Sequence, residues 1–175
     1  MRFLTDFRLL LIALWLGAAC FFSFAVAPSA FGVLPSRELA GSMVSRTLLI
    51  VNISGIVIGA ISILLSFVGT KGGNKIKIWS ERFLLLILTA ACAVGQFVIG
   101  IWLSYTKSQM GKPIDEVAAD DPLRIQFNQL HEYSVWILVT AMIAALISFF
   151  LIGWKTTAKV VEKKKDPYDF SDLIH

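Results

Sequence analysis

Four long apolar stretches dominate this sequence and limit what it can fold into: Leu9–Ala27, Leu48–Val68, Phe83–Leu103 and Val135–Ile152. At about 1.5 Å per residue, about 20 helical residues cross the roughly 30 Å hydrocarbon core of a bilayer. Because lipid offers no hydrogen-bond partners, the backbone of each stretch must pair within its own segment, which requires a helix. We therefore predict an all-α integral membrane protein with four transmembrane helices, arranged as two hairpins.

Composition agrees with this class. Apolar residues make up 57% of the 175 residues and charged residues 16%, and the mean hydropathy is +0.74. The positions of the four apolar stretches predict a transmembrane domain over residues 1–155 and a charged cytoplasmic tail over 156–175. The net charge of +4 does not predict nucleic-acid binding, because the basic residues cluster beside the apolar stretches. The lipid bilayer is the expected partner for those charges.

The first stretch has an alternative interpretation as a cleaved secretory signal. Two arginines, Arg2 and Arg8, precede it, and Ala25-Val26-Ala27 resembles a cleavage site. Pro28, at the position after the cut, disfavours cleavage. The apolar run is also longer than the apolar region of a typical signal peptide, which is about 7–15 residues. We therefore expect an uncleaved first span.

The distribution of basic residues predicts the orientation. Of 16 lysines and arginines, two precede the first span, four lie in the second connection and five in the tail, all on one side. The positive-inside rule then places both termini in the cytoplasm, and we expect a multi-pass protein of the bacterial inner (plasma) membrane. Tryptophans fit this frame, with Trp102 and Trp136 at the outer interface and Trp79 and Trp154 at the inner one. Trp15 does not fit an interfacial belt and is predicted to pack within the bundle.

Helix-start signals occur in both external connections. After Pro28 and Pro35 the chain is expected to be irregular, with Ser36 capping the next helix. Asp121 followed by Pro122 is a strong start signal for the last helix, which meets no breaker before Lys155. Both helices exceed the thickness of the membrane core. We therefore expect the second and fourth helices to extend beyond the outer leaflet.

Small and polar residues within the spans predict helix–helix contacts, since they mediate packing in lipid. Gly55 and Gly59 form a small-xxx-small pattern, which favours packing inside the bundle and leaves a dimer face as an alternative. Asn52 and Gln96 are expected to form polar contacts between helices.

No catalytic motif is present in the sequence, and we expect no enzyme and no metal site. Ionisable residues are nearly absent from the centres of the four stretches, whereas pumps and ion-coupled carriers usually keep a buried Asp, Glu, Lys or Arg. His131 and His175 fall on opposite sides of the predicted membrane, which excludes a bis-histidine haem within one chain. No cofactor is required by the sequence; a tetrapyrrole bound through His131 alone is an option, and a hydrogen-bonded interfacial histidine is the alternative.

The candidate site is a polar cluster at the outer boundary of the membrane. Asn128, His131 and Ser134 recur at i, i+3 on one stripe of the fourth helix. They are expected to face residues of the first connection, either as a binding or docking surface or as a polar clamp between the hairpins. The residues from that connection are Arg37, Glu38 and Arg46.

Two sets of residues resemble a known family. The first set is Trp15-Leu16-Gly17, Phe21-Phe22, Ala27-Pro28, Phe31, Leu34-Pro35 and Ala40-Gly41, and the second is Phe127, Leu130, His131 and Ser134. Together they resemble the two signatures of the domain-of-unknown-function 4149 family, to which the eukaryotic transmembrane protein 205 is related. The resemblance implies a four-span membrane protein and carries no mechanism.

These patterns favour a non-enzymatic accessory subunit of a larger inner-membrane complex, with an electron-transfer (respiratory or photosynthetic) assembly as one option. Two alternatives stay open: a homo-oligomeric permease or channel for a small solute, and a subunit that binds pigment or haem through His131. The expected partners are other integral membrane subunits or further copies of this chain.

Overall fold

The computed structural model describes residues 2–68 and 75–162, with side chains over 3–68 and 75–154. Every element in these ranges is helical, and the prediction of four helices able to cross a membrane is confirmed. The first rod comprises α1 (Arg2–Phe21), the π-helical turn η1 (Phe22–Val26) and α2 (Ala27–Val33), and the second is α3 (Arg37–Val68). The third comprises α4 (Lys75–Ala93), the π-helical turn η2 (Val94–Ile99) and α5 (Gly100–Met110). After the short 3-10 helix η3 (Ile114–Glu116), α6 (Pro122–Glu162) forms the fourth.

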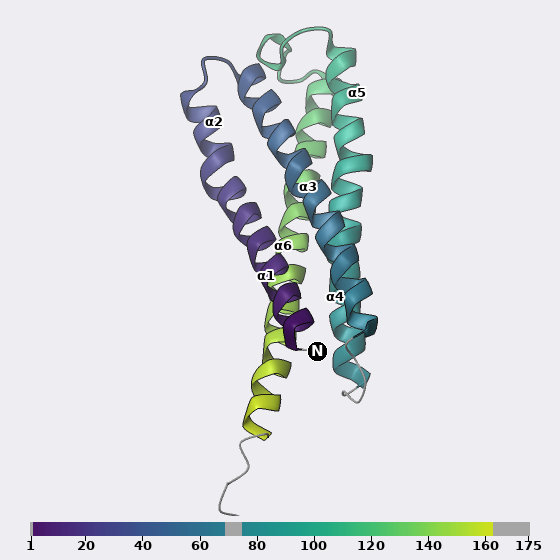
Figure 1. The fold of residues 1–175 in the computed structure, drawn as a ribbon. Coiled ribbons are helices and arrows are strands. Elements are labelled where there is room, and N and C mark those ends of the chain that lie inside the picture. Colours follow the sequence, from purple (N-terminus) through teal and green to yellow (C-terminus); the bar gives the residue numbers. More distant parts are fainter. Residues whose placement is uncertain (1, 69–74, 163–175) are drawn as a thin grey trace, which may run out of the picture.

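The four rods run antiparallel to their sequence neighbours (Figure 1). Helix α1 packs on α3 and α6, and α4 also packs on α3 and α6, so that α1 and α4 lie diagonally across the bundle. We call the end that holds the N-terminus the terminal end. The opposite end, where α2 joins α3 and α5 joins α6, is the connection end.

Each rod buries one stripe of residues whose spacing alternates between three and four. This is the heptad spacing of about 3.5 residues per turn that produces knobs-into-holes packing in left-handed bundles. The stripes are Arg8, Ile12, Trp15, Ala19 and Phe22; Asn52, Gly55, Gly59, Ser62 and Ser66; Glu81, Leu85, Leu88, Cys92, Gly95 and Ile99; and Ala141, Ala145, Ser148 and Ile152. The core is therefore continuous along the bundle, and most other large apolar side chains face outward, as expected in lipid.

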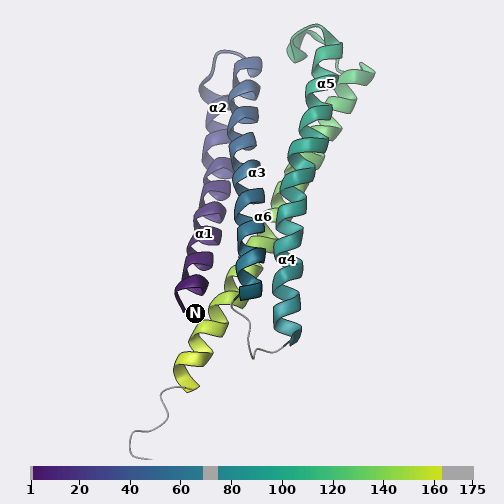
Figure 2. The same cartoon turned by 45° about the vertical axis from the view of Figure 1, so that its right-hand side comes forward.

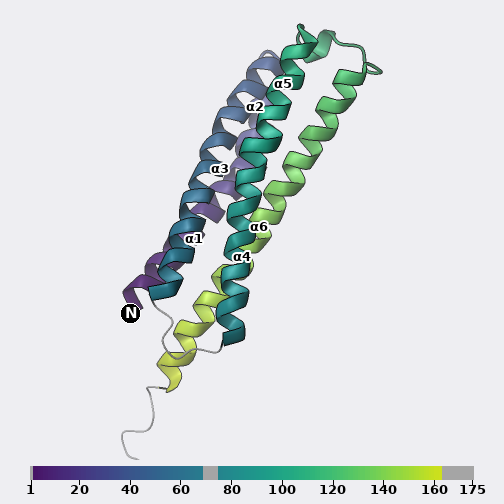
Figure 3. The same cartoon turned by 90° about the vertical axis from the view of Figure 1, so that its right-hand side faces the viewer.

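The two hairpins separate toward the connection end (Figure 2). There, α2 packs on α3 and α5 packs on α6, whereas the extensive contacts between hairpins involve α1 and α4. Helix α6 lies along the whole third rod and continues past the other helices at the terminal end (Figure 3). The core that joins the hairpins is thus concentrated in the half of the bundle nearer the termini.

Both predicted helix starts are confirmed. The amide of Leu39 donates to Ser36 Oγ at 3.2 Å, and the amide of Leu123 donates to Asp121 Oδ1 at 2.8 Å. These side chains satisfy amides that the first helical turn leaves without a backbone partner.

Extension beyond the membrane core is not limited to the second and fourth helices. The first rod does not become irregular after Pro28, as expected from the sequence, but stays helical to Val33. Proline lacks the amide that an α-helix needs at that position, and the preceding turn changes accordingly to π-helical bonding, with the amide of Ala27 donating to the carbonyl of Phe22. The helix therefore passes through the proline and ends six residues later than the predicted span.

The predicted boundary at residue 155 lies inside a helix, since α6 continues to Glu162. The rest of the predicted tail, 163–175, lies outside the described residues, as does 69–74 of the second connection.

Candidate functional site

The outer polar cluster expected from the sequence is not assembled as predicted. Asn128 and His131 are exposed on α6, whereas Ser134 turns into the bundle. Arg46 is exposed on α3. Because α6 packs mainly on α1, α4 and α5, its polar stripe does not lie against the start of α3.

The charged residues at the start of α3 instead pair with the second hairpin. Arg37 Nε lies 3.6 Å from Asp115 Oδ1 in η3, and Glu38 Oε1 lies 3.3 Å from Lys107 Nζ in α5. All four side chains are largely exposed, and such pairs contribute only about 0–1 kcal/mol. They bridge the connection end, where the hairpins diverge, without holding it rigidly.

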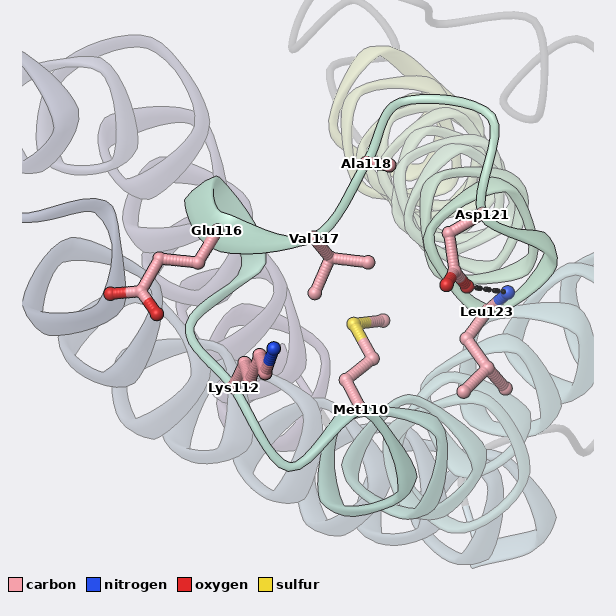
Figure 4. A pocket seen from close by; sticks show the side chains of 7 residues that line it. All are labelled: Met110, Lys112, Glu116, Val117, Ala118, Asp121 and Leu123. Carbon is pink, nitrogen blue, oxygen red and sulfur yellow. Dashed lines mark hydrogen bonds between the residues drawn. The ribbon is translucent and has the colours of Figure 1, made fainter.

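A pocket of about 220 Å³ lies beside the loop between α5 and α6 (Figure 4). The side chains of Met110 and Val117 point toward its centre, and the carboxylate of Glu116 turns away from it. Asp121, at its edge, is already engaged as the helix cap of α6. The lining is completed by Lys112, Ala118 and Leu123, and this half-open pocket offers no convergent set of reactive groups.

His131 is the only described histidine, and it lies on the exposed side of α6. The structure brings neither the arginines of the first connection nor Glu38 to it. Tetrapyrrole binding through His131 therefore stays a prediction with no further support from its surroundings. Within the described residues no three His, Cys, Asp or Glu side chains cluster in a way that would hold a metal ion.

The strongest electrostatic feature is a buried ion pair at the terminal end, which the sequence did not predict. Arg8 of α1 donates to the Glu81 carboxylate of α4 across the bundle diagonal. Arg8 is 6% exposed and Glu81 1%. Moving either charge out of water alone is costly, so the pair is stable only because each group neutralises the other.

A second arginine joins α4 to the end of α3. Arg82 Nε donates to Ser66 Oγ at 2.9 Å, and its terminal nitrogen donates to the Ser66 carbonyl at 3.2 Å. The guanidinium also lies 3.8 Å from the ring centroid of Phe67. Carbonyls in the last helical turn have no partner within the helix, so Arg82 serves as a C-terminal cap for α3.

The next heptad positions toward the middle are also polar. Ser62 of α3 and Ser148 of α6 are both fully buried, and neither hydroxyl has a hydrogen-bond partner among the described residues. The Nε of Arg8 is likewise buried without a partner in the part of the chain that the structure describes. We call Arg8, Ser62, Ser66, Glu81 and Ser148 the polar layer; each of the four helical rods contributes to it.

The middle of the bundle is closely packed. A Cβ on Gly55 would lie 2.5 Å from Cys92 Sγ and 2.7 Å from Trp15 Nε1, and a Cβ on Gly59 would collide with Thr89. Both glycines therefore pack against other helices of the same bundle, which is the arrangement that the sequence favours. The Gly55/Gly59 face is thus not available for contact with a second copy of the chain. Trp15 is buried as predicted, and its indole donates to the Val51 carbonyl at 2.9 Å.

Asn52 and Gln96 occupy the level above these glycines. Asn52 is buried, and a Cβ on Gly95 would lie 3.4 Å from its Nδ2, so α3 and the third rod approach closely there. Gln96 is half-buried in the π-helical turn η2. The predicted packing role of Asn52 is consistent with this placement.

The polar layer was missed because its charges lie at the edges of apolar stretches, where lysine and arginine ordinarily flank the membrane. The sequence pattern assigns Arg8 to the basic residues that flank the first span and predicts no role for Glu81. A signal was present in the heptad phase: Arg8 and Glu81 continue the stripes that begin with Ile12 and Leu85. Residues in that phase face the interior, so both charges are directed into the bundle.

Together, the four apolar rods, the heptad core and the ionic end define a multi-pass helical membrane protein. Comparison with family models gives the more specific assignment: residues 10–112 match the model described as domain of unknown function (DUF4149). Since the match covers more than half of the chain, the protein belongs to this family. It includes the first sequence signature and ends before α6, which carries the second. No curated protein and no solved structure matches the chain.

Proposed function

We propose that this chain is a non-enzymatic accessory subunit that docks onto other integral subunits of a bacterial inner-membrane assembly, with both termini in the cytoplasm. The observation that carries the proposal is exposed apolar surface at the connection end, beyond the reach of lipid chains. It lies on the extended parts of α2 and α3.

Helix length supports a position of this surface outside the hydrocarbon core. The 32 residues of α3 extend about 48 Å, against roughly 30 Å for the core. Arg46 is exposed, and the residues between it and the end of the helix are sufficient to cross the core. The preceding turns therefore stand above the membrane, where Leu39 is 54% exposed and Met43 47%.

Neighbouring elements add apolar side chains at the same end. Phe31 and Val33 are exposed on α2, which packs on α3. Apolar patches that neither water nor lipid chains favour mark protein interfaces. An electron-transfer complex is one candidate for the assembly.

The experiment is purification from native membranes in a mild detergent, followed by size determination and identification of co-purifying subunits. We expect a species larger than the 19.3 kDa chain that contains other integral membrane proteins. The substitution Leu39→Glu should release the chain from that species, while Ser45→Glu, a matched change at an exposed polar position of α3, should not. Recovery of the wild-type protein as a lone monodisperse chain would overturn the proposal.

A second function, a permease or channel for a small solute, gains support from the buried Arg8–Glu81 pair. Intramembrane charges of this kind often mark ion and substrate pathways. Because Gly55 and Gly59 are engaged within the bundle, self-association would have to use another surface. Solute uptake into liposomes tests this function; activity that Asn52→Ala or Gln96→Ala abolishes would favour it over the docking role.

A further inference from the structure

We propose that α4 and α6 form a binding site for one anionic phospholipid at the terminal end, where Lys77 meets Trp154. Lys77 binds the headgroup phosphate, and an acyl chain lies on the exposed apolar face of α6. The site is at the opposite end of the bundle from the docking surface on α2 and α3. The inference goes beyond the docking role and does not depend on it.

The first observation is a contact between a cation and a ring on two different helices. Lys77 Nζ of α4 lies 5.7 Å from the ring centroid of Trp154 on α6. The ring attracts the ammonium group and restricts its position, but it occupies only one side of a group that has three N–H donors. Lys77 is exposed and makes no ion pair with any described residue. Its other donors are therefore available to an acceptor from outside the chain.

The second observation concerns the depth of this contact in the membrane. Trp154 lies where the apolar part of α6 ends, next to Lys155, and Trp79 lies just before the apolar part of α4 begins. Both rings are largely exposed. Exposed tryptophans at the ends of membrane spans lie at the level of the lipid headgroups. We therefore expect Lys77 Nζ, beside one of these rings, to lie at the depth of the lipid phosphates.

The third observation is the apolar face of α6 that leads away from this cation. Phe150, Ile147 and Ile143 precede Trp154 at positions i−4, i−7 and i−11, which is the spacing of one helix face. All three side chains are exposed, and Phe150 is 63% exposed. An acyl chain whose phosphate is bound at Lys77 can lie along this face. A cation at the end of an apolar face fits a phospholipid rather than a free phosphate ion.

The charge balance of the terminal end favours an anionic lipid. Arg8 and Glu81 neutralise each other, and the remaining described charges of this end are those of Asp6, Lys75, Lys77 and Arg82. The balance is positive, whereas described acidic residues outnumber basic ones at the connection end. A lysine near an anionic membrane surface strengthens binding by about fivefold, which corresponds to about 1 kcal/mol. A zwitterionic headgroup carries its own cation, which offsets this gain.

The test identifies the lipid beside Trp154 from the quenching of its fluorescence by brominated acyl chains. The full chain is reconstituted into phosphatidylcholine vesicles in which a varied fraction of the lipid is brominated, as either phosphatidylglycerol or phosphatidylcholine. Two variants keep the buried Trp15, and one also keeps Trp154 and the other Trp136, with the remaining tryptophans replaced by phenylalanine. Trp136 is the matched control, because it is exposed on the same face of α6 and no described cation lies over its ring.

We expect brominated phosphatidylglycerol to reach half-maximal quenching of Trp154 at a mole fraction about fivefold lower than brominated phosphatidylcholine. Trp136 should not distinguish the two lipids. Lys77→Gln should remove the preference at Trp154, and Lys77→Arg should keep it. Lys112→Gln, at an exposed cation of the connection end, should leave it unchanged. Because each result is a ratio between two lipids, any change in the intrinsic fluorescence of Trp154 cancels.

Two results would contradict the site. An equal preference at Trp154 and Trp136 would show that the protein attracts anionic lipid only through its general charge. A preference at Trp154 that survives Lys77→Gln would show that Lys77 does not bind the headgroup.

Discussion

Arg8 and Glu81 form an ion pair although they lie on helices that face each other across the bundle diagonal and are 73 residues apart in sequence. The pair links the first hairpin to the second at the end where both hairpins pack closely. It therefore acts on the tertiary arrangement of the helices, which have already satisfied their own backbones in the membrane.

Removing one member of this pair should destabilise the protein strongly. Glu81→Gln or Arg8→Leu leaves the other charge buried, a change that costs about 3–5 kcal/mol. The double variant Arg8→Leu/Glu81→Leu should be closer to wild type than either single variant, because no charge stays unpaired. Thermal unfolding in detergent measures this, with Asp6→Asn, at an exposed carboxylate of α1, as the control. Equal effects of Asp6→Asn and Glu81→Gln would contradict the account.

The ion pairs at the connection end should behave in the opposite way. Arg37→Ala and Lys107→Ala remove exposed partners at 3.6 Å and 3.3 Å, so each should change the unfolding free energy by less than about 1 kcal/mol. Because exposed charges are screened, even this effect should fall as the salt concentration rises. The measurement is the unfolding midpoint at low and high salt; a large, salt-independent loss would show that the hairpins are firmly held together there.

The glycines of α3 should differ sharply from a glycine of α1. Gly55→Ala places a Cβ 2.5 Å from Cys92 Sγ and 2.7 Å from Trp15 Nε1. Either the helices must separate or the side chains of Cys92 and Trp15 must both move. We expect a loss of about 1–3 kcal/mol, as for other overpacked cores. Gly17→Ala has nothing within 4 Å of its new Cβ and should be neutral or stabilising. If both variants unfold at the wild-type midpoint, the close packing of α3 against α1 and α4 is wrong.

Trp15 provides a spectroscopic test of the core. Trp15→Phe keeps an aromatic ring but removes the hydrogen bond to Val51, and a loss of about 1 kcal/mol is expected. The matched change Trp79→Phe, at a ring exposed toward the surroundings of the bundle, should have little effect on stability. Two variants are compared, one with Trp15 and one with Trp79 as the single tryptophan of the five in the chain. A water-soluble quencher should reduce the fluorescence of Trp15 less than that of Trp79; the reverse order would contradict the packing.

Sequence reasoning recovered those features that depend on local chemistry. The four spans follow from apolar length, and the helix starts at Arg37 and Pro122 follow from the Ser36 and Asp121 caps. The burial of Trp15 and the position of Gly55 inside the bundle follow because helices in lipid associate through small residues and polar contacts.

What was missed depends on pairing between distant segments. The choice of Asp115 as partner of Arg37, and of Arg8 as partner of Glu81, is set by which helices are neighbours and in which register they pack. Charge type alone does not determine this, since several acidic and basic residues are present at each end. Continuity of the first helix through Pro28 also depended on a π-helical turn that residue preferences do not indicate.

The most direct test of the docking role is site-specific photocrosslinking in native membranes, with the reactive group placed at Leu39 or at Leu64. In the proposed placement, Leu39 belongs to the extramembrane part of α3 and Leu64, which is 67% exposed, to its membrane-spanning part. The account predicts a discrete protein adduct from position 39 that the substitution Met43→Glu weakens, and mainly lipid adducts from position 64. No protein adduct from position 39 in membranes where the chain is correctly inserted would contradict it.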